Sequence, residues 1–414
     1  MAGTLPGKVP ATFSPFVRQG RLVGVLCVAE ILGMTPFSMF LALQPQLRDA
    51  WGLSNTAGGW ISSAYYAGYM AAVPILASLT DRLDARAVWL AATATAGASA
   101  LGFASIADGL WTAAFFQFLA GISLAGTYMP GLKLMADRID GVPHPRLVGF
   151  YTTSFTIGSA LSFALIGQLT EWFPWRTTIA LVALGPAIAW TLMLMFVQPA
   201  PIRTSPSRTT RGHWRQVLRS ASAMRYVLAY SCHMWELFAI RAWLVAFLSF
   251  CERLQGRPSF ASAATIAGII AMVGVPSSLA GAELSARVDR KYLVLTIMLI
   301  STVTSVAFGG TAATSWTVIL VAAVISSVFV SADSAALTSG IVAVSPPESR
   351  GTAMAIYSMA GFAAASAGAF AVGVLLDVLG GQTTTSWMIA FGVMGASNLL
   401  GALVLWTAPE PTLN

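Results

Sequence analysis

Three residues that can hold charge or exchange a proton lie between Cys232 and Trp243, in a segment that is otherwise apolar and aromatic. They are His233, Glu236 and Arg241. A guanidinium keeps its charge, whereas a desolvated Glu or a His gains or loses a proton near neutrality. Successive residues of a helix turn by about 100°, so the three side chains share one flank. The pattern indicates a fixed cation with titratable neighbours, in a run of about the length that crosses a bilayer.

Two further acids, Glu30 and Asp333, also lie in apolar sequence. A charged group at the centre of a bilayer costs about 2.5–3.5 kcal/mol on insertion scales, so such residues usually face a cavity and serve a pathway. Glu30 lies about 13 Å along a helix from Arg21, and Glu236 about 16 Å from Arg225, near the middle of a core about 30 Å thick. We predict that these acids, with the histidine and the arginine, bind solute or carry a coupled proton. The alternative is a structural ion pair with a packed histidine.

Neutral polar residues in the apolar runs add candidate hydrogen-bonding groups to this site. Gln117, Tyr128 and Tyr357 could contact a solute. Helix packing or anchoring at the membrane interface explains each of them equally well.

Signatures of enzymes and of ATP-driven pumps are missing from the sequence. Lys8, Lys133 and Lys291 are followed by Val, Leu and Tyr, so no phosphate-binding G-x-x-x-x-G-K-[ST] loop exists. Two of the three cysteines fall inside apolar runs and one at the edge of a run, which predicts neither a disulfide nor a metal site. We expect no enzyme activity, no metal and no cofactor, and a proton gradient as the driving force.

Composition decides which elements must position these residues. The chain has 414 residues, of which 56% are hydrophobic and 9% charged, and its mean hydropathy is +0.73. So much apolar surface exceeds what one soluble core can bury, so we predict a multi-pass, all-α membrane protein. Windows of about 19 residues predict twelve membrane-spanning helices. They lie near 21–43, 58–79, 86–107, 109–135, 147–169, 177–197, 225–250, 260–281, 292–312, 315–343, 351–376 and 386–407.

The net charge of +7 could suggest a nucleic-acid partner, but the basic residues follow membrane topology instead. If the N-terminus is cytoplasmic, the opposite face holds only Arg48, Arg176, Arg253 and Arg257. The positive-inside bias therefore predicts that both termini are cytoplasmic, with membrane lipid and no nucleic acid as the surroundings.

A polar, basic and proline-containing stretch, 198–224, divides the chain into two similar parts. We predict an N-terminal six-helix half, 1–197, a cytoplasmic linker, 198–224, and a C-terminal six-helix half, 225–414. Several pairs repeat at a nearly constant offset: Glu30 with Glu236, Arg82 with Arg287, Arg146 with Arg350, and Tyr151 with Tyr357. The two six-helix bundles are thus expected to be pseudo-symmetric.

The segment from Ala77 to Arg86 resembles the loop signature G-x-x-x-D-R-x-G-x-R of the major facilitator superfamily, in which Ala77 and Asp84 depart from the glycines. This resemblance covers essentially the whole chain. It implies a cytoplasmic gating loop in which Asp81 is held against the other half. The residues of the two copies of this loop are Asp81, Arg82, Arg86, Arg287, Asp289 and Lys291. The alternative is ordinary loop charge.

The resemblance also implies that the first and seventh spans line a central cavity, where Glu30 and Glu236 would face one another. Arg241 would then attract an anionic group of the solute or pair with Glu30. Many members of the family have arginine in place of Gln117, so proton coupling through that position is not expected here.

The predicted function is secondary active transport by alternating access. The preferred solute is a small organic anion, and the expected mode is proton-coupled symport. The alternative is a proton-coupled exporter of cationic or amphipathic drugs, in which Glu30 and Glu236 attract the cation. We expect a monomer in the cytoplasmic (inner) membrane.

Overall fold

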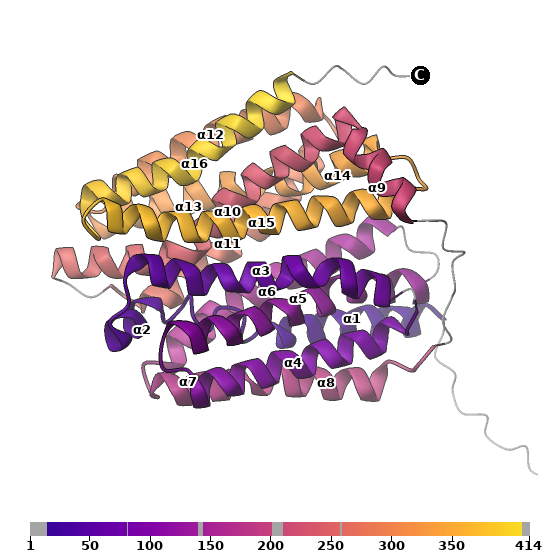
Figure 1. The fold of residues 1–414 in the computed structure, drawn as a ribbon, viewed down its shortest axis with the longest axis horizontal. Helices are drawn as coiled ribbons and strands as arrows, with labels where there is room; N and C mark the ends of the chain where they lie inside the picture. The colour runs from indigo at the N-terminus through magenta and orange to yellow at the C-terminus, as the bar shows by residue number, and fades with distance from the viewer. Residues whose placement is uncertain (1–14, 81, 140–143, 201–209, 257–258, 408–414) are drawn as a thin grey trace, which may run out of the picture.

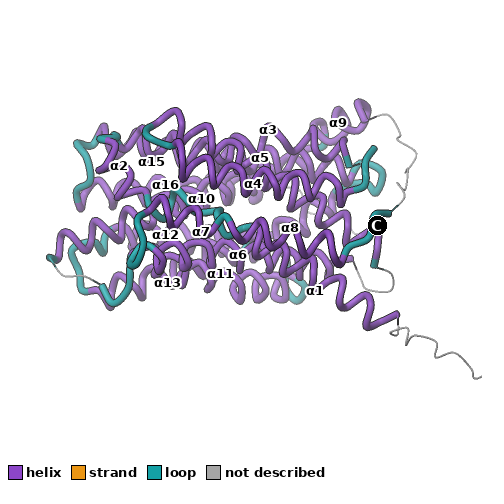
Figure 2. The backbone as a smooth tube through the Cα atoms, turned by 90° about the horizontal axis from the view of Figure 1, so that it is seen from below, coloured by secondary structure: helices purple, strands orange, loops and turns teal. Residues whose placement is uncertain are grey.

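The computed structural model describes the chain except for residues 1–14, 81, 140–143, 201–209, 257–258 and 408–414. Within the described residues all regular structure is helical, and the helices run along one common direction (Figure 2). The first group is α1 (Pro15–Gly33), α2 (Gln44–Trp51), α3 (Asn55–Leu79), α4 (Ala85–Ile106), α5 (Leu110–Arg138), α6 (His144–Leu169), α7 (Trp175–Val182) and α8 (Leu184–Phe196). The second is α9 (Thr210–Arg219), α10 (Ala221–Gln255), α11 (Ala263–Ser285), α12 (Arg290–Gly309), α13 (Trp316–Ala332), α14 (Ser334–Val344), α15 (Arg350–Val378) and α16 (Thr384–Trp406).

Ten stretches of the described chain are long and apolar enough to cross a membrane. They comprise α4, α5, α6, the α7–α8 pair, α10, α11, α12, the α13–α14 pair, α15 and α16. The predicted spans 21–43 and 58–79 are not among them, so an arrangement of twelve spans stays a prediction. The second of these, α3, carries Asn, Thr, Ser and Tyr side chains that lower its hydropathy.

The first predicted span is broken in the middle. Its helix α1 ends at Gly33, and residues 34–43 form successive turns before α2 begins. Pro36 has no backbone N–H, and several bonds in this segment are short-range, such as Met39 N–H to the Pro36 carbonyl at 3.0 Å. The turn residues are nevertheless buried. Non-helical backbone at this depth is tolerated only where protein or a wet cavity surrounds it.

Figure 1 shows two layers of helices, with α1–α8 below and α10–α16 above. The layers meet along two seams, which we define as α3 against α15 and α6 against α11. Backbones approach closely at both seams: a Cβ added to Gly59 would lie 2.9 Å from the Ala369 carbonyl oxygen, and one on Gly268 would lie 2.7 Å from that of Ala160. Small residues thus let the halves pack backbone to backbone.

A carboxylate joins the layers at the end of the molecule where α2 lies. Asp377, in the last turn of α15, accepts hydrogen bonds from the first backbone amides of α3, at 3.1 Å from Asn55 N–H and 2.7 Å from Thr56 N–H. The Asn55 amide side chain adds a third bond at 2.7 Å. A carboxylate at a helix N-terminus satisfies orphan amides and complements the helix dipole. This contact, which we call the Asp377 latch, links the two halves at that end.

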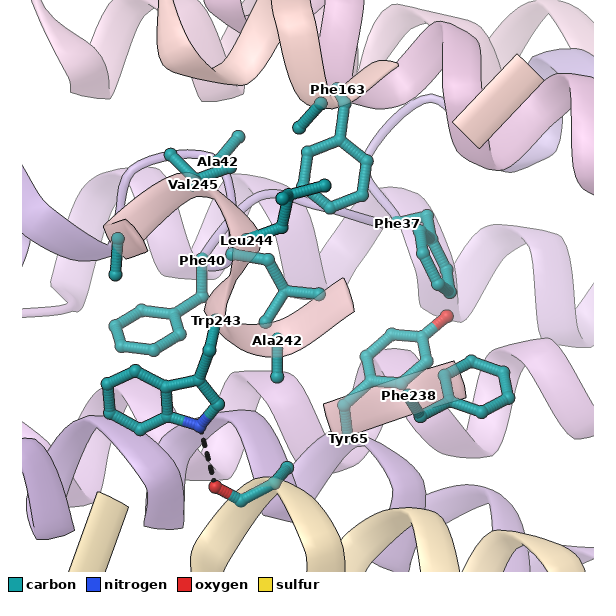
Figure 3. Packing of buried hydrophobic residues seen from close by; sticks show 14 of the residues in the cluster. Phe37, Phe40, Ala42, Tyr65, Phe163, Phe238, Ala242, Trp243, Leu244 and Val245 are labelled. Carbon is teal, nitrogen blue, oxygen red and sulfur yellow. Dashed lines mark hydrogen bonds between the residues drawn. The ribbon is translucent and has the colours of Figure 1, made fainter. Parts of the chain in front are cut away.

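The largest hydrophobic cluster lies where the layers meet and is rich in aromatic rings. Figure 3 shows part of it, with the Trp243 indole donating to the Ala369 carbonyl oxygen at 2.9 Å. Phe238 lies among the same residues, and its ring packs on Tyr66 of α3 with 4.8 Å between ring centroids. Aromatic side chains from both halves therefore close off the space around the middle of α10.

Candidate functional site

Arg241 lines a cavity beside α10. The cavity holds about 40 Å³ for the centres of water-sized molecules, which is room for a few waters. Its walls come from α6, α10, α11, α12 and α13 and are almost wholly apolar, apart from the guanidinium and three hydroxyls, those of Ser326, Ser327 and Ser331. The Ser326 hydroxyl is buried and has no hydrogen-bond partner.

The Arg241 guanidinium has no acidic partner among the described residues. Its carbon lies 5.2 Å from the centroid of the Phe238 ring, in cation–π geometry. Its Nη1 is buried without a hydrogen-bond acceptor, and the Tyr66 hydroxyl nearby is also unpartnered. The predicted pairing with Glu30 is therefore wrong for this conformation. Arg241 is half-buried, and its Nη1 is a buried donor without an acceptor, which is costly.

Glu236 faces the interior of its own half. The Ser301 and Ser305 hydroxyls of α12 donate to its two carboxylate oxygens at 2.7 and 2.6 Å, and the Asn398 amide of α16 donates a further bond. The side chain is fully buried. Three neutral donors thus surround this carboxylate, which does not line the cavity of Arg241.

Glu30 also faces the interior of its own half. Its Oε2 lies 2.7 Å from the hydroxyl of Tyr151 on α6. That hydroxyl also contacts the indole N–H of Trp89 on α4 at 3.2 Å and the carbonyl of Thr127 on α5 at 3.0 Å. The other Glu30 oxygen, Oε1, is buried and has no partner.

The expectation that Glu30 and Glu236 face one another across a cavity is wrong in this conformation. The two occupy matching places in the two halves, but each bonds to helices of its own half. The sequence gives the position of each acid along its helix. The direction in which its side chain points depends on which neighbouring helices offer hydrogen-bond donors. For the acids those neighbours are Tyr151 in one half and Ser301 and Ser305 in the other.

His233 lies against the break between α13 and α14. Its Nδ1 is 2.8 Å from Oδ1 of Asp333, the residue between the two helices, and both side chains are buried. The atoms are at ion-pair distance, although their angles are not those of a hydrogen bond. The sequence singled out both residues but did not pair them. The structure brings them together, on the Glu236 side of α10.

The remaining predicted site residues are dispersed. Tyr128 lies 3.0 Å from the Thr152 hydroxyl, and its ring packs near Tyr151 at 5.8 Å between centroids. Tyr357 stacks on Tyr230 at 3.7 Å. Gln117 is fully buried in α5, and neither polar atom of its side chain has a partner. None of the three lines the cavity of Arg241.

Asp84, which stands where the loop signature has a glycine, makes most of the contacts that anchor the predicted gating loop. Asp84 caps α4 by accepting from Arg86 N–H at 3.0 Å, and it binds Arg138 at 2.9 and 3.2 Å. It also accepts from Ala200 N–H, just after α8, at 2.9 Å. Burial raises the pKa of this carboxyl, but the amide donors of Ala200 and Arg86 and the Arg138 charge outweigh it and lower the pKa. The sequence signal was the acid directly before a helix.

The other loop residues make weaker contacts. Asp81 lies outside the described residues, and Arg82 is exposed. The Arg86 guanidinium reaches the Leu194 carbonyl at 3.4 Å. In the second copy, Asp289 caps α12 through Tyr292 N–H at 3.1 Å. Arg287 pairs with Glu283, in the last turn of α11, at 2.6 Å. Lys291 lies in the first turn of α12.

No group of three or more His, Cys, Asp or Glu side chains that could hold a metal is found in the described part of the chain. The hydroxyl and amide partners of Glu236 and the Asp377 latch were missed by sequence reasoning. Serine, asparagine and a helix-terminal aspartate are too common to stand out without the contacts that the fold creates.

Comparisons with known proteins place the chain among membrane transporters. The sequence profile described as Major Facilitator Superfamily matches residues 26–308 and 257–414. A Bos taurus protein, solute carrier family 22 member 7, is 30% identical over 163 residues, which is 39% of this chain and 28% of that protein. The chain therefore matches less than a third of that relative's length.

Solved structures show the same fold at low identity. The nucleoside transporter NupG has a TM-score of 0.75 with 13% identity, covering 94% of this chain and 100% of that one. The human organic anion transporter MFSD10 has a TM-score of 0.70 with 17% identity, covering 94% and 99%. The profile spans nearly all of the chain, and the chain therefore belongs to the Major Facilitator Superfamily.

Proposed function

We propose that the chain is a secondary active transporter that moves a small organic anion by alternating access, with a proton as the coupled ion. The observation that carries the proposal is Arg241, an unpaired guanidinium on the wall of a cavity in the membrane-spanning region. A fixed cation with apolar surroundings attracts an anionic group and accommodates an apolar body.

The contacts of the acids favour an anion over the alternative, a cationic drug. A cation exporter needs a free carboxylate in its binding cavity. Glu30 and Glu236 bond instead to side chains of their own halves, and neither lines the cavity that holds Arg241.

The size and closure of the cavity support alternating access. About 40 Å³ is too small for an organic solute, so binding requires the halves to move apart. The Asp377 latch and the two seams close the end of the molecule that holds α2. Among proteins of the same fold, MFSD10 is described as an organic anion transporter and NupG as a nucleoside transporter, so the fold is compatible with an anion and does not select one.

Topology, location and assembly are parts of the same proposal. We propose twelve spans, six in each half, from the apolar runs of the sequence, and both termini in the cytoplasm from the distribution of basic residues. We propose a monomer in the cytoplasmic membrane, with the acidic and histidine residues of the two halves as proton carriers.

The test is a binding screen on the purified, detergent-solubilised protein, in which small carboxylates compete with small organic cations. Arg241→Ala should weaken binding of the anion about 10- to 100-fold, because a charge-assisted bond is worth about 1.5–3 kcal/mol. Arg241→Lys should retain part of the affinity, since lysine keeps the charge but loses the planar fork. Arg219→Ala, which removes an exposed arginine of α9, is the matched control and should bind as wild type does.

Two results would contradict the proposal. One is unchanged anion affinity in Arg241→Ala. The other is tight binding of cations that Glu30→Gln abolishes, which would favour the drug-exporter alternative.

A further inference from the structure

The Tyr151 hydroxyl allows the protons around Glu30 to be counted. A phenol has one proton to donate and lone pairs to accept with. Three groups lie at hydrogen-bond distance from this hydroxyl: the Trp89 indole N–H at 3.2 Å, the Thr127 carbonyl at 3.0 Å and Glu30 Oε2 at 2.7 Å. The indole can only donate and the carbonyl can only accept. The single phenol proton therefore satisfies the Thr127 carbonyl only if it does not go to Glu30.

A protonated Glu30 completes this network. Its O–H then donates to the Tyr151 oxygen, the Trp89 N–H donates to the same oxygen, and the phenol proton goes to the Thr127 carbonyl. Each of the three contacts contains one proton. If Glu30 is ionised, the phenol proton must serve Glu30 or Thr127, and one of the two oxygen–oxygen contacts has no proton.

The surroundings of Glu30 offer no compensation for a negative charge. The side chain is 1% exposed, and its Oε1 has no donor. The titratable groups that interact with it are Cys27 on α1, Tyr65 and Tyr69 on α3, Tyr128 on α5 and Tyr151 on α6, all of them neutral in ordinary proteins at neutral pH. In the described part of the chain, no cation lies at ion-pair distance from Glu30. An unpaired buried charge of this kind is avoided by binding a proton.

Glu236 occupies the matching place in the other half but has the opposite surroundings. Two hydroxyls and an amide N–H donate to its oxygens, so both oxygens are satisfied without a proton. The titratable neighbours that face it are His233 on α10 and Asp333 at the α13–α14 break, which lie 2.8 Å from one another. The two mirrored acids are therefore not equivalent.

We propose that Glu30 is the residue that carries the coupled proton in this conformation and that Tyr151 positions that proton. This inference rests on the proposed function only in calling the proton a coupled one. The protonation state itself stands on the geometry.

The position of Glu30 explains how its proton could influence the seams. Glu30 lies in the last turn of α1 before the broken segment 34–43. Its partner Tyr151 is on α6, and a Cβ on Gly167 of the same helix would meet the Thr265 backbone of α11 at 2.6 Å. Loss of the proton would leave Glu30 and the Thr127 carbonyl competing for the one phenol proton. A shift of α6 relative to α1 and α5 would relieve that competition, and α6 forms one of the two seams.

The test is infrared spectroscopy of the detergent-solubilised full chain at neutral pH with no solute added, because a protonated carboxyl and a carboxylate absorb at separate positions. The wild-type protein should show a protonated-carboxyl band. Glu30→Gln should remove this band, whereas Glu236→Gln and Asp333→Asn should leave it. A wild-type spectrum without the band, or a band that disappears in Glu236→Gln or Asp333→Asn but persists in Glu30→Gln, would overturn the proposal.

Tyr151→Phe gives a second test if Glu30→Gln does not fold. Without the phenol oxygen the Glu30 O–H loses its acceptor, so the band should move to higher frequency. A band that stays in place would show that the proton belongs to another group. Neither readout depends on transport or on solute, so failure of anion binding at Arg241 and failure of this assignment can be told apart.

Discussion

The contact between His233 and Asp333 is the most deeply buried ion-pair contact found among the described side chains. The two groups are 1% and 2% exposed and 2.8 Å apart. Water cannot replace a lost partner at this depth, so each group depends on the other. The cost of breaking such a pair exceeds the net stabilisation from forming it, because the remaining charge stays buried.

We expect strong coupling between these two residues in a double-mutant cycle. His233→Gln and Asp333→Asn should each destabilise the protein by about 3–5 kcal/mol, and the double mutant by clearly less than the sum of the two. The measurement is chemical unfolding in detergent. The exposed pair Arg287 and Glu283, 2.6 Å apart, is the control and should show little coupling. Additive effects at His233 and Asp333 would mean that the contact is incidental.

Asp84 lies outside the membrane-spanning helices, and its contacts predict that the stability of the folded protein depends on pH. Its pKa is lowered in the folded protein, because hydrogen bonds from Ala200 and Arg86 and the Arg138 charge outweigh burial. A lowered folded pKa adds stability above the unfolded value of about 3.9, and this stability disappears as the pH falls below that value.

Asp84→Asn should therefore reduce stability at pH 7 by up to about 1 kcal/mol, because it removes the charge that pairs with Arg138 while the amide oxygen can still cap α4. The difference between wild type and variant should shrink near pH 3, where the wild-type carboxyl begins to bind a proton. Melting curves of both proteins across this range check the prediction. Equal differences at both pH values would contradict it.

At the scale of single helices, several crossings depend on glycine. A Cβ on Gly121 of α5 would lie 1.8 Å from the Tyr65 carbonyl oxygen, and one on Gly68 of α3 would lie 2.1 Å from that of Phe118. The two helices thus approach backbone to backbone from both sides. No side chain can move aside to make room, so a methyl group there must push the helices apart.

Gly121→Ala should destabilise the protein by about 1–3 kcal/mol, the usual cost of overpacking. Gly149→Ala in α6, where a Cβ would meet nothing within 4 Å, is the matched control. It should be neutral or stabilise by up to about 1 kcal/mol, since alanine favours helix. Thermal unfolding of the two variants in one detergent makes the comparison. Similar melting temperatures would refute the close crossing.

The sequence predicted where the helices lie better than it predicted where they break. The predicted span 225–250 lies inside α10 and 386–407 nearly coincides with α16, because long apolar runs have one stable form in lipid. The break at Asp333 was not predicted, since hydropathy does not report where tertiary contacts replace helical bonds, whereas Pro36 marks the break in the first span. For the same reason the sequence identified Glu30, Glu236 and Arg241 as unusual but could not give the directions of their side chains.

At the scale of the whole molecule, the Asp377 latch joins the two halves at the α2 end. One carboxylate of the C-terminal half satisfies two backbone amides and one side-chain amide of the N-terminal half. Its loss removes three charge-assisted bonds at once, and few other polar contacts cross between α3 and α15. Examples are the Ser63 and Ser366 hydroxyls, 2.7 Å apart, and the Tyr69 and Ser358 hydroxyls, 3.3 Å apart.

Asp377→Asn should shift the population toward a form open at the α2 end, by roughly 1–3 kcal/mol, which is about a 5- to 150-fold change in the equilibrium. The measurement is the distance between spin labels placed near the first turn of α3 and the last turn of α15. Asp108→Asn removes an exposed carboxylate at the loop between α4 and α5 and serves as the control. Identical distance distributions in Asp377→Asn and wild type would exclude the latch as a determinant of closure.

The two seams also have a mechanical consequence. Glycines bring the backbones together at particular points of both seams, but along α3 and α15 aromatic rings also interlock, with Tyr69 stacked on Phe362 at 3.7 Å and Trp60 packed on Phe370 at 5.5 Å between centroids. A seam of this kind combines close backbone approach with stacked rings, so sliding along it is opposed by the loss of ring packing. Separation of the halves would therefore have to break these ring contacts along the seam as well as the polar contacts at the α2 end.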